Sequence, residues 1–261
     1  MQFKDQINRV FELPKTPKRI ISLVPSQTEL LVDLGLEDSI IGVTKFCVHP
    51  SHLIKNKTVV GGTKNIKIDI IKNLQPDFIL CNKEENTKEI VEICEKIAPT
   101  HVSDIFTIDD SKKLIIEYGE LLSCKTEATK VVREIDLRFT DFKQYLKNYS
   151  HKKVAYFIWR NPWMVAGNNT FINHLLELNN FKNIYNNKER YPEININNST
   201  HIPELILLSS EPYPFKEKHI EEINNYSKKT KIILVDGEMF SWHGSRLIKA
   251  FDYFKELHKN I

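Results

Sequence analysis

The chain has 261 residues, of which 41% are hydrophobic and 27% are charged, and its formal net charge at pH 7 is +3. This composition is typical of a soluble globular protein with one large domain or two lobes, and it excludes a disordered chain. The nearly balanced charge and the absence of a long basic run argue against nucleic acid as a partner.

The N-terminus and the cysteines bear on location. Residues 1–6 lack the basic region, apolar core and cleavage site of a secretory signal, and no apolar stretch approaches the roughly 20 residues of a transmembrane helix. As written, the protein is therefore expected in the cytoplasm, whereas a trimmed start would allow a periplasmic or surface-anchored protein. The four cysteines form no CxxC pair, which suits reduced thiols.

Short apolar runs alternate with amphipathic stretches from Arg19 to about Leu122. Strands are expected over residues 20–24, 40–43, 59–60 and 78–81, and helices over 29–36 and 68–74. The alternation indicates βαβ units and hence a mainly parallel sheet. Ser26 lies three residues before Glu29, which predicts a capping box at the start of the first helix.

Residues 124–150 contain neither glycine nor proline, and apolar residues recur there at steps of three and four. This pattern predicts one amphipathic helix, roughly 40 Å long at 1.5 Å per residue. A helix of that length would act as a stiff spine.

The second half of the chain repeats the strand and helix signals of the first half. Strands are expected over residues 154–158, 205–208 and 232–235, and helices over 170–178, 216–226 and 245–257. Residues 179–198 are rich in asparagine and poor in apolar residues, which predicts a surface loop.

Two segments of the first half recur in the second. Residues 76–82 (PDFILCN) resemble residues 203–209 (PELILLS), and residues 18–24 resemble residues 152–158 in pattern. We therefore predict an α/β fold of two similar Rossmann-like lobes with mainly parallel sheets, over residues 1–123 and 151–261, bridged by one long α-helix over 124–150. Two such lobes imply a cleft, and a ligand is expected beyond the carboxyl ends of the strands.

Two loops of the first lobe could contact a ligand. Cys47, His49 and His52 lie in the loop after the second strand and could offer ligands to a metal, although a plain loop is the alternative and a zinc site would need a second pair. Gly61 and Gly62 follow the next strand, where they form either a tight turn or a ligand-facing loop. Their spacing matches neither of the common nucleotide-binding glycine motifs.

All three tryptophans fall at expected carboxyl ends of second-lobe strands. Trp159, Trp163 and Trp242 occupy turns flanked by Pro, Gly and Ser, which favours a ligand-facing aromatic wall over a core position. Arg160 and Arg246 lie beside them and are candidates for meeting an acidic or amide group of the ligand.

Support for an enzyme is weak, because no hydrolase, metalloprotease or kinase motif is present. His243, with Ser245 and Glu238 nearby in sequence, could act as a base, but closeness in sequence does not establish productive geometry. No catalytic residue is therefore predicted.

The motifs over residues 17–31, 34–36, 41–44 and 74–80 resemble the helical-backbone substrate-binding proteins of ABC importers. These are the cobalamin, haem and siderophore receptors, and the likeness is greatest to the corrinoid-binding branch. The resemblance implies a ligand held between two lobes with little domain closure. It requires no cofactor, and the implied ligand is a small-molecule metal chelate, cobalamin or another corrinoid first, otherwise haem or a metal-siderophore.

The resemblance and the strand tips together predict the ligand-binding residues. His49 and His243 are expected to approach the metal of a bound chelate. Asn82 stands where the corrinoid-binding branch carries an aromatic residue, so one wall of such a site would come from elsewhere. The full predicted set is Pro25, Ser26, Lys45, Phe46, His49, Lys64, Asn82, Trp159, Arg160, Trp163, Phe240, Trp242, His243 and Arg246.

The resemblance also implies a partner, because members of this family dock on a permease through acidic side chains of each lobe. Candidates here are Glu84, Glu85, Glu89, Glu211 and Glu217, and the protein itself is expected to be a monomer. Two alternatives stay open. One is a cytoplasmic enzyme acting on a corrinoid or a small metabolite, and the other is a receptor for a free transition-metal ion bound by Cys47, His49 and His243.

Overall fold

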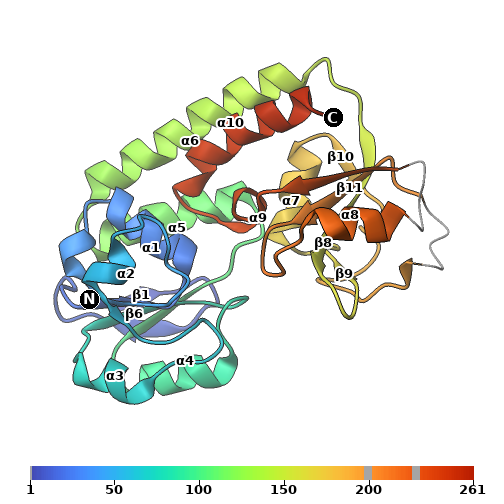
Figure 1. Cartoon of the computed structure of the whole chain (residues 1–261). Coiled ribbons are helices and arrows are strands. Elements are labelled where there is room, and N and C mark those ends of the chain that lie inside the picture. Colours follow the sequence, from blue (N-terminus) through green and yellow to red (C-terminus); the bar gives the residue numbers. More distant parts are fainter. Residues whose placement is uncertain (1, 197–201, 225–229) are drawn as a thin grey trace. The chain divides into compact units, whose positions relative to one another are not determined.

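The computed structural model describes residues 2–196, 202–224 and 230–261. The chain forms two compact units (Figure 1), which are described separately below: unit 1 is Met1–Leu137 with His243–Ile248, and unit 2 is Arg138–Trp242 with Lys249–Ile261. The long helix α6 spans Lys125–Leu146, so the division between the units falls inside it. The chain later returns to unit 1 for a short segment before it ends in unit 2.

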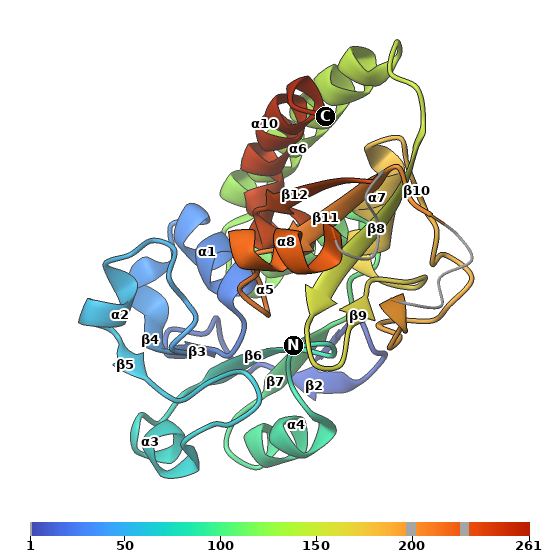
Figure 2. The ribbon, with the colours of Figure 1, turned by 45° about the vertical axis from the view of Figure 1, so that its right-hand side comes forward.

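Unit 1 contains a five-stranded parallel sheet in the order β5-β4-β3-β6-β7. Its strands are β3 (Ile20–Ser22), β4 (Ile40–Val43), β5 (Thr58–Val59), β6 (Phe78–Asn82) and β7 (Thr100–Ser103). Figures 1 and 2 show α3 (Ile68–Asn73) and α4 (Lys88–Glu95) on one face, and α1 (Pro25–Asp33) and α5 (Ile108–Leu121) on the other. This doubly wound arrangement confirms the predicted fold class.

The remaining elements of unit 1 are short. The hairpin of β1 (Gln2–Lys4) and β2 (Val10–Glu12) precedes the sheet, and α2 (Leu53–Asn56) lies between β4 and β5. The buried Asp5 carboxylate accepts a hydrogen bond from Val102 N in β7 at 3.2 Å and one from Arg9 Nη2 at 2.7 Å. Asp5 therefore ties the hairpin turn to the edge strand of the sheet.

Unit 2 contains a sheet of four parallel strands in the order β10-β8-β11-β12, and β9 pairs antiparallel with β8. The strands are β8 (Lys152–Trp159), β9 (Met164–Val165), β10 (Phe181–Asn183), β11 (Leu205–Ser209) and β12 (Lys231–Val235). The helices are α7 (Phe171–Leu178), α8 (Glu217–Asn224), α9 (Gly237–Ser241) and α10 (Arg246–Lys259), whose first residues belong to unit 1.

Two predicted segments of unit 2 differ from the structure or extend beyond the described residues. The prediction that residues 179–198 form only a loop is wrong at β10, where Phe181 is buried and Asn183 donates to Ala166 O at 2.9 Å. This strand buries only one aromatic side chain, Phe181, and one hydrogen-bonded amide, Asn183. Its sequence therefore contains no apolar run that would predict a strand. Residues 197 and 198 of that stretch, and residues 225 and 226 of the predicted helix 216–226, lie outside the described residues.

The repeated segments form the same strand pair in both units. Ile20 pairs with Phe78 in unit 1, and Val154 pairs with Leu205 in unit 2, which is the register that the sequence alignment implies. The acidic residue of each Pro-Asp or Pro-Glu dipeptide accepts a hydrogen bond from the backbone of the neighbouring strand segment. Asp77 Oδ1 accepts from Arg19 N, and Glu204 Oε2 accepts from Lys153 N, both at 2.8 Å. The motif therefore satisfies a backbone N–H where the first strand begins.

In unit 2, the C-terminal part of α6 packs along α10, and Figures 1 and 2 show the two helices side by side. The Phe142 ring lies 5.7 Å from that of Phe251 and 5.8 Å from that of Phe254. The exposed Arg138 pairs with Asp252 at 2.8 Å. The predicted single helix therefore has a partner that sequence periodicity did not identify, and its stiffness stays a prediction.

The predicted capping box of α1 is wrong. The N-cap is Val24, which makes no side-chain cap, and Pro25 takes the first helical turn. Ser26 and Glu29 are engaged instead by His243 and Arg246, both distant in sequence. A true capping box opens α5, between Thr107 and Asp110. Tertiary partners have overridden the local signal at α1.

Helices α5 and α6 approach closely at Gly119 in unit 1. A Cβ atom on Gly119 would lie 2.6 Å from Ala128 Cβ, so no side chain fits there. We expect Gly119→Val to lower the free energy of unfolding by about 1–3 kcal/mol, measured by urea denaturation. The double variant Gly119→Ala with Ala128→Gly moves one methyl group to the facing helix and should recover most of the loss caused by Gly119→Ala alone. Equal stability of Gly119→Val and the parent would contradict the close contact.

Candidate functional site

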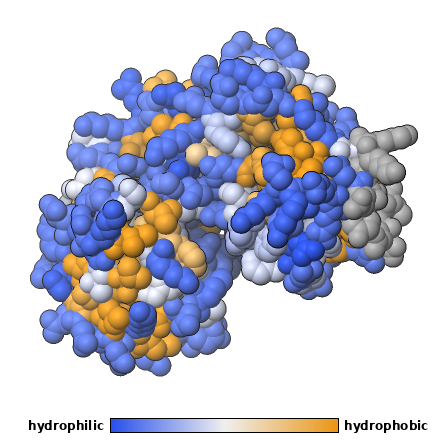
Figure 3. All heavy atoms as spheres, in the orientation of Figure 1, coloured by the Kyte–Doolittle hydropathy of each residue, from blue (hydrophilic) through white to orange (hydrophobic). Residues whose placement is uncertain are grey.

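The predicted ligand-binding residues divide into an accessible and a buried group. Those with side chains exposed or half-buried are Lys45, Phe46, His49, Lys64, Trp159, Arg160 and Trp163. Those that are buried are Pro25, Ser26, Asn82, Phe240, Trp242, His243 and Arg246. Hydrophobic residues are visible at the surface of both units on the face drawn in Figure 3.

In unit 1, two loops meet at the carboxyl ends of β4 and β5. Lys45 N donates to Gly61 O at 2.8 Å, which ties the loop after β4 to the glycine turn after β5. Phe46 is 48% exposed, and its ring lies against Gly62. Gly61 has φ +117°, and a Cβ there would lie 2.5 Å from Asn65 O. The glycine pair is thus a tight turn that also allows an aromatic ring to lie over the backbone.

Asn82, at the carboxyl end of β6, is 4% exposed and organises the next loop. Its Oδ1 accepts from Glu84 N at 2.9 Å and from Glu85 N at 3.1 Å, and its Nδ2 donates to Ser103 Oγ at 2.9 Å. Ser209, the equivalent tip residue of β11, also accepts a backbone N–H two residues on, from Glu211 at 3.3 Å. The polar tip of each repeat therefore caps a turn.

The return segment His243–Ile248 packs on α1 inside unit 1. Arg246 Nε donates to Glu29 Oε2 at 2.8 Å, and both side chains are 4% exposed. His243 Nε2 lies 3.4 Å from Ser26 Oγ, and Gly244 N donates to Ser111 Oγ at 2.8 Å. Burial lowers the pKa of His243 to about 4, so its imidazole is neutral at pH 7. The side chains of His243 and Arg246 therefore pack and form contacts inside unit 1.

The buried His243 predicts a loss of stability in acid. Because burial lowers its pKa from 6.5 to about 4, the unfolded chain binds the proton more readily than the folded protein below pH 6.5. Stability should be full above pH 6.5 and fall by about 2–3 kcal/mol towards pH 4 for this group. His258, whose pKa burial also lowers to about 4, should contribute likewise from unit 2. Urea denaturation at several pH values would measure this loss, and an unchanged pH dependence in His243→Gln would contradict it.

The loop after β4 does not assemble a site for a free metal ion. Cys47 is buried, its Sγ lies 3.1 Å from Thr28 Oγ1, and burial raises the pKa of its thiol. His52 Nε2 instead lies 2.8 Å from Glu37 Oε1 at the surface, and His49 is half-buried. Over residues 2–196, 202–224 and 230–261, no group of three His, Cys, Asp or Glu side chains is arranged to hold a metal.

In unit 2, aromatic side chains gather at the carboxyl ends of β8 and β11. Trp159 is 39% exposed, and its ring meets that of Tyr213 edge-on at 5.7 Å. Trp163 stacks on Phe215 at 6.1 Å with an interplanar angle of 6°. Tyr213 also contacts Phe215, so these rings form one aromatic cluster in which each ring restricts its neighbour. Trp159 is the exposed member of this cluster.

The cations and the remaining aromatics of unit 2 have partners of their own. Arg160 forms two hydrogen bonds of 2.8 Å with the carboxylate of Glu222, and the guanidinium holds the pKa of that carboxyl below its usual range. Phe240 is fully buried, and the indole of the buried Trp242 donates to Glu211 Oε1 at 2.8 Å. Arg160 is thus neutralised, and the other two side chains belong to the packed interior.

Tyr213 and Phe215 were missed by the sequence reasoning. They follow the second copy of the repeat, in the run Glu211-Pro212-Tyr213-Pro214-Phe215, directly after the strand tip. Aromatic residues separated by prolines beyond a strand end are a signal of an ordered loop. The sequence of residues 211–215 therefore carries a signal for this aromatic cluster that the tryptophans alone do not.

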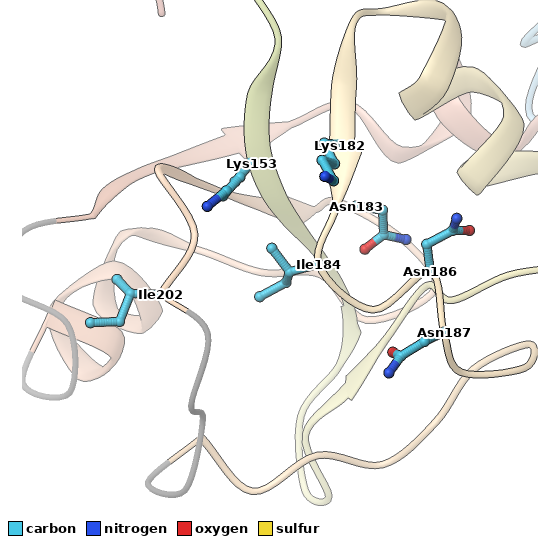
Figure 4. Close-up of a pocket in the computed structure, with 7 residues that line it drawn as sticks. All are labelled: Lys153, Lys182, Asn183, Ile184, Asn186, Asn187 and Ile202. Atoms are coloured by element: carbon cyan, nitrogen blue, oxygen red, sulfur yellow. The ribbon is translucent and has the colours of Figure 1, made fainter.

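A surface pocket of about 600 Å³ lies elsewhere in unit 2 (Figure 4). Lys153 is near the start of β8, whereas Trp159 ends that strand, so the pocket is at the opposite end from the aromatic cluster. The Asn183 amide within it already donates to Ala166 O and Asn173 Oδ1. The lining residues are Lys153, Lys182, Asn183, Ile184, Asn186, Asn187 and Ile202.

Comparison with known proteins relates these features to a family. The sequence model of the periplasmic binding protein family matches residues 20–225. An uncharacterised ABC transporter substrate-binding lipoprotein of Bacillus subtilis is 24% identical, over 97% of this chain and 83% of the relative. A vitamin B12-binding protein of Photorhabdus laumondii is 24% identical, over 90% of this chain and 85% of the relative.

Solved structures support the fold. A periplasmic haem-binding protein of Pseudomonas aeruginosa superposes with a TM-score of 0.79 over 92% of this chain and 92% of that chain, at 17% identity. At this identity the likeness concerns the fold alone, and it agrees with the two α/β units and the long helix described above.

The resemblance predicted from the opening and Pro-Asp motifs is confirmed by these matches, and so is the prediction of a protein without turnover. The cytoplasmic location is not supported, because the family is named for the periplasm and one relative is a lipoprotein. None of the helices in the described part of the chain has the length and hydropathy to cross a bilayer. The family model spans both copies of the strand repeat, and the chain belongs to the periplasmic binding protein family as a solute-binding protein.

Proposed function

We propose that this protein is the receptor of an ABC importer for a metal-bearing chelate, and that the chelate is a corrinoid. The observation that carries the proposal is the exposed aromatic side chain at the carboxyl end of a sheet in each unit, Phe46 in unit 1 and Trp159 in unit 2. Rings at such positions suit the apolar face of a macrocycle. The choice of a corrinoid rests on the similarity to the vitamin B12-binding protein of Photorhabdus laumondii.

The proposed ligand contacts are narrower than the sequence prediction. We assign them to Lys45, Phe46, His49, Lys64, Trp159 and Trp163, whose side chains are accessible. Arg160 and Arg246 are left out because Glu222 and Glu29 neutralise them. His49 is retained as the histidine that would approach the metal, since His243 is buried beside Ser26.

A permease partner belongs to the same proposal. Of the acidic side chains considered for docking, Glu89 on α4 and Glu217 on α8 are exposed. Glu211 instead accepts hydrogen bonds from Ser241 and Trp242 inside unit 2. We therefore propose Glu89 and Glu217 as the docking side chains, and an extracytoplasmic location in keeping with the lipoprotein relative.

Absorbance titrations would test the ligand class. We expect cobalamin or cobinamide to show a saturable change in its visible spectrum when the purified protein is added, and haem to serve as the competing chelate. Metal analysis after dialysis provides the control for the free-ion alternative, because a tight ion site would retain stoichiometric metal. Saturable binding of haem without any corrinoid response would identify haem, and not a corrinoid, as the ligand. A retained free ion without chelate binding would contradict the proposed function.

A further inference from the structure

Lys45 and Phe46 form a small corner at the carboxyl end of β4, directly over the glycine turn after β5. The Lys45 ammonium lies 4.9 Å from the centre of the Phe46 ring. A Cβ on Gly62 would lie 3.2 Å from Phe46 Cε2 and 3.6 Å from Lys45 Cε, so the glycine leaves room for both side chains. The corner presents a positive charge over an exposed aromatic ring.

No ion pair within the described parts of the chain neutralises the charge of this corner. Among the described residues, Lys45 has no carboxylate within ion-pair distance. Other cations near strand tips do have one, since Lys83 pairs with Asp104 at 2.5 Å and Arg160 with Glu222 at 2.8 Å. Lys45 is therefore available to an anion from outside.

Lys64, the other accessible lysine predicted to contact a ligand from unit 1, has partners in the loop after β6. Lys64 Nζ donates to the backbone oxygen of Glu84 at 2.5 Å. Burial raises the pKa of the Glu85 carboxyl, and the Lys64 ammonium acts in the opposite direction, so this carboxyl lies near Lys64. Lys64 is thus partly compensated, and Lys45 is the better candidate for contact with a ligand anion.

We infer that Lys45 binds an anionic group placed beside the apolar face of the chelate, while Phe46 contacts that face. This inference rests on the proposed function and adds a charge requirement to it. In a corrinoid, the group is the phosphodiester of the nucleotide loop, which cobalamin has and cobinamide lacks. In haem, the corresponding chemistry is a propionate carboxylate, which esterification removes. Phosphodiester and carboxylate share a negative charge and acceptor oxygens.

The test compares two ligand pairs that differ in the anionic group. Cobalamin and cobinamide are titrated against the parent protein, Lys45→Gln and Lys45→Arg, and haem and haem dimethyl ester form the second pair. Lys130→Gln is the matched control, because Lys130 is an exposed lysine on α6. We expect Lys45→Gln to weaken cobalamin or haem binding about fivefold to tenfold, to change cobinamide or the ester less than about twofold, and Lys45→Arg to retain binding.

Each outcome has a defined meaning. Equal weakening of both members of a pair by Lys45→Gln, or no weakening of either, would overturn the inference and leave the proposed function intact. An effect of Lys130→Gln as large as that of Lys45→Gln would overturn it too, because a general change of charge would then suffice. Failure of the parent protein to bind any of the four compounds would overturn the proposed function itself. Thermal denaturation of each variant confirms that the exposed substitutions leave the fold unchanged.

Discussion

Replacing Arg246 with methionine is expected to lower the free energy of unfolding by about 3–5 kcal/mol, the largest stability effect that we predict. Arg246 and Glu29 are 4% exposed and joined at 2.8 Å within unit 1. Removing the guanidinium leaves the Glu29 carboxylate buried without this counter-charge, and that penalty exceeds the ordinary worth of an ion pair. Urea denaturation monitored by circular dichroism would measure the loss.

Two controls separate the buried charge from lost packing. The double variant Glu29→Leu with Arg246→Met removes both charges and should recover most of the stability, because paired apolar side chains of similar volume replace a buried ion pair at little cost. Arg138→Met breaks the exposed pair with Asp252, whose side chains are 41% and 54% exposed, and should cost less than about 1 kcal/mol. If Arg246→Met cost no more than Arg138→Met, the buried pair would not have the role given to it.

The second large effect concerns binding. Phe46→Ala and Trp159→Ala are each expected to weaken chelate affinity about tenfold to a hundredfold, because large aromatic side chains contribute most of the energy of such contacts. Both side chains are partly exposed, at 48% and 39%, so their removal should cost little stability. Isothermal titration of each variant with the chelate that the parent protein binds would measure the change.

A matched control is available on the same protein. Leu137 on α6 is 55% exposed, so Leu137→Ala removes a comparable accessible apolar side chain at a position with no proposed ligand contact. It should change the affinity by less than about twofold, within the usual range for a surface substitution. Unchanged affinity in both Phe46→Ala and Trp159→Ala would remove the aromatic contacts from the account, whereas loss in only one would assign the ligand face to that unit.

The strand framework could be predicted from the sequence because its signals are local. The Pro-Asp and Pro-Glu dipeptides at residues 76–77 and 203–204 precede strands in the same register. Their carboxylates accept hydrogen bonds from backbone N–H groups where the neighbouring strand begins. Alternating apolar runs then fix which segments enter the sheet. Strand β10 has no such apolar run, because only Phe181 and Asn183 of this strand are buried, and its sequence therefore does not predict a strand.

The site was harder to predict, because accessibility depends on partners far away in sequence. The sequence near Arg246 shows no acidic partner for it, because its partner Glu29 is 217 positions away. Trp242 lies in a turn-like sequence, and only the fold shows that its indole meets Glu211. Asn82 ends an apolar strand, and its amide is used by the turn that follows. A residue at a strand tip is thus a candidate for binding only after its internal partners are known.

The most direct test of the account is a calorimetric titration of the purified protein with cobalamin, with cobinamide and haem titrated in parallel. We predict saturable binding of about one corrinoid per chain with a Kd in the micromolar range or below, which corresponds to roughly −8 kcal/mol or better. No saturable heat with any of the three chelates, from protein that unfolds cooperatively in the same buffer, would contradict the proposed function.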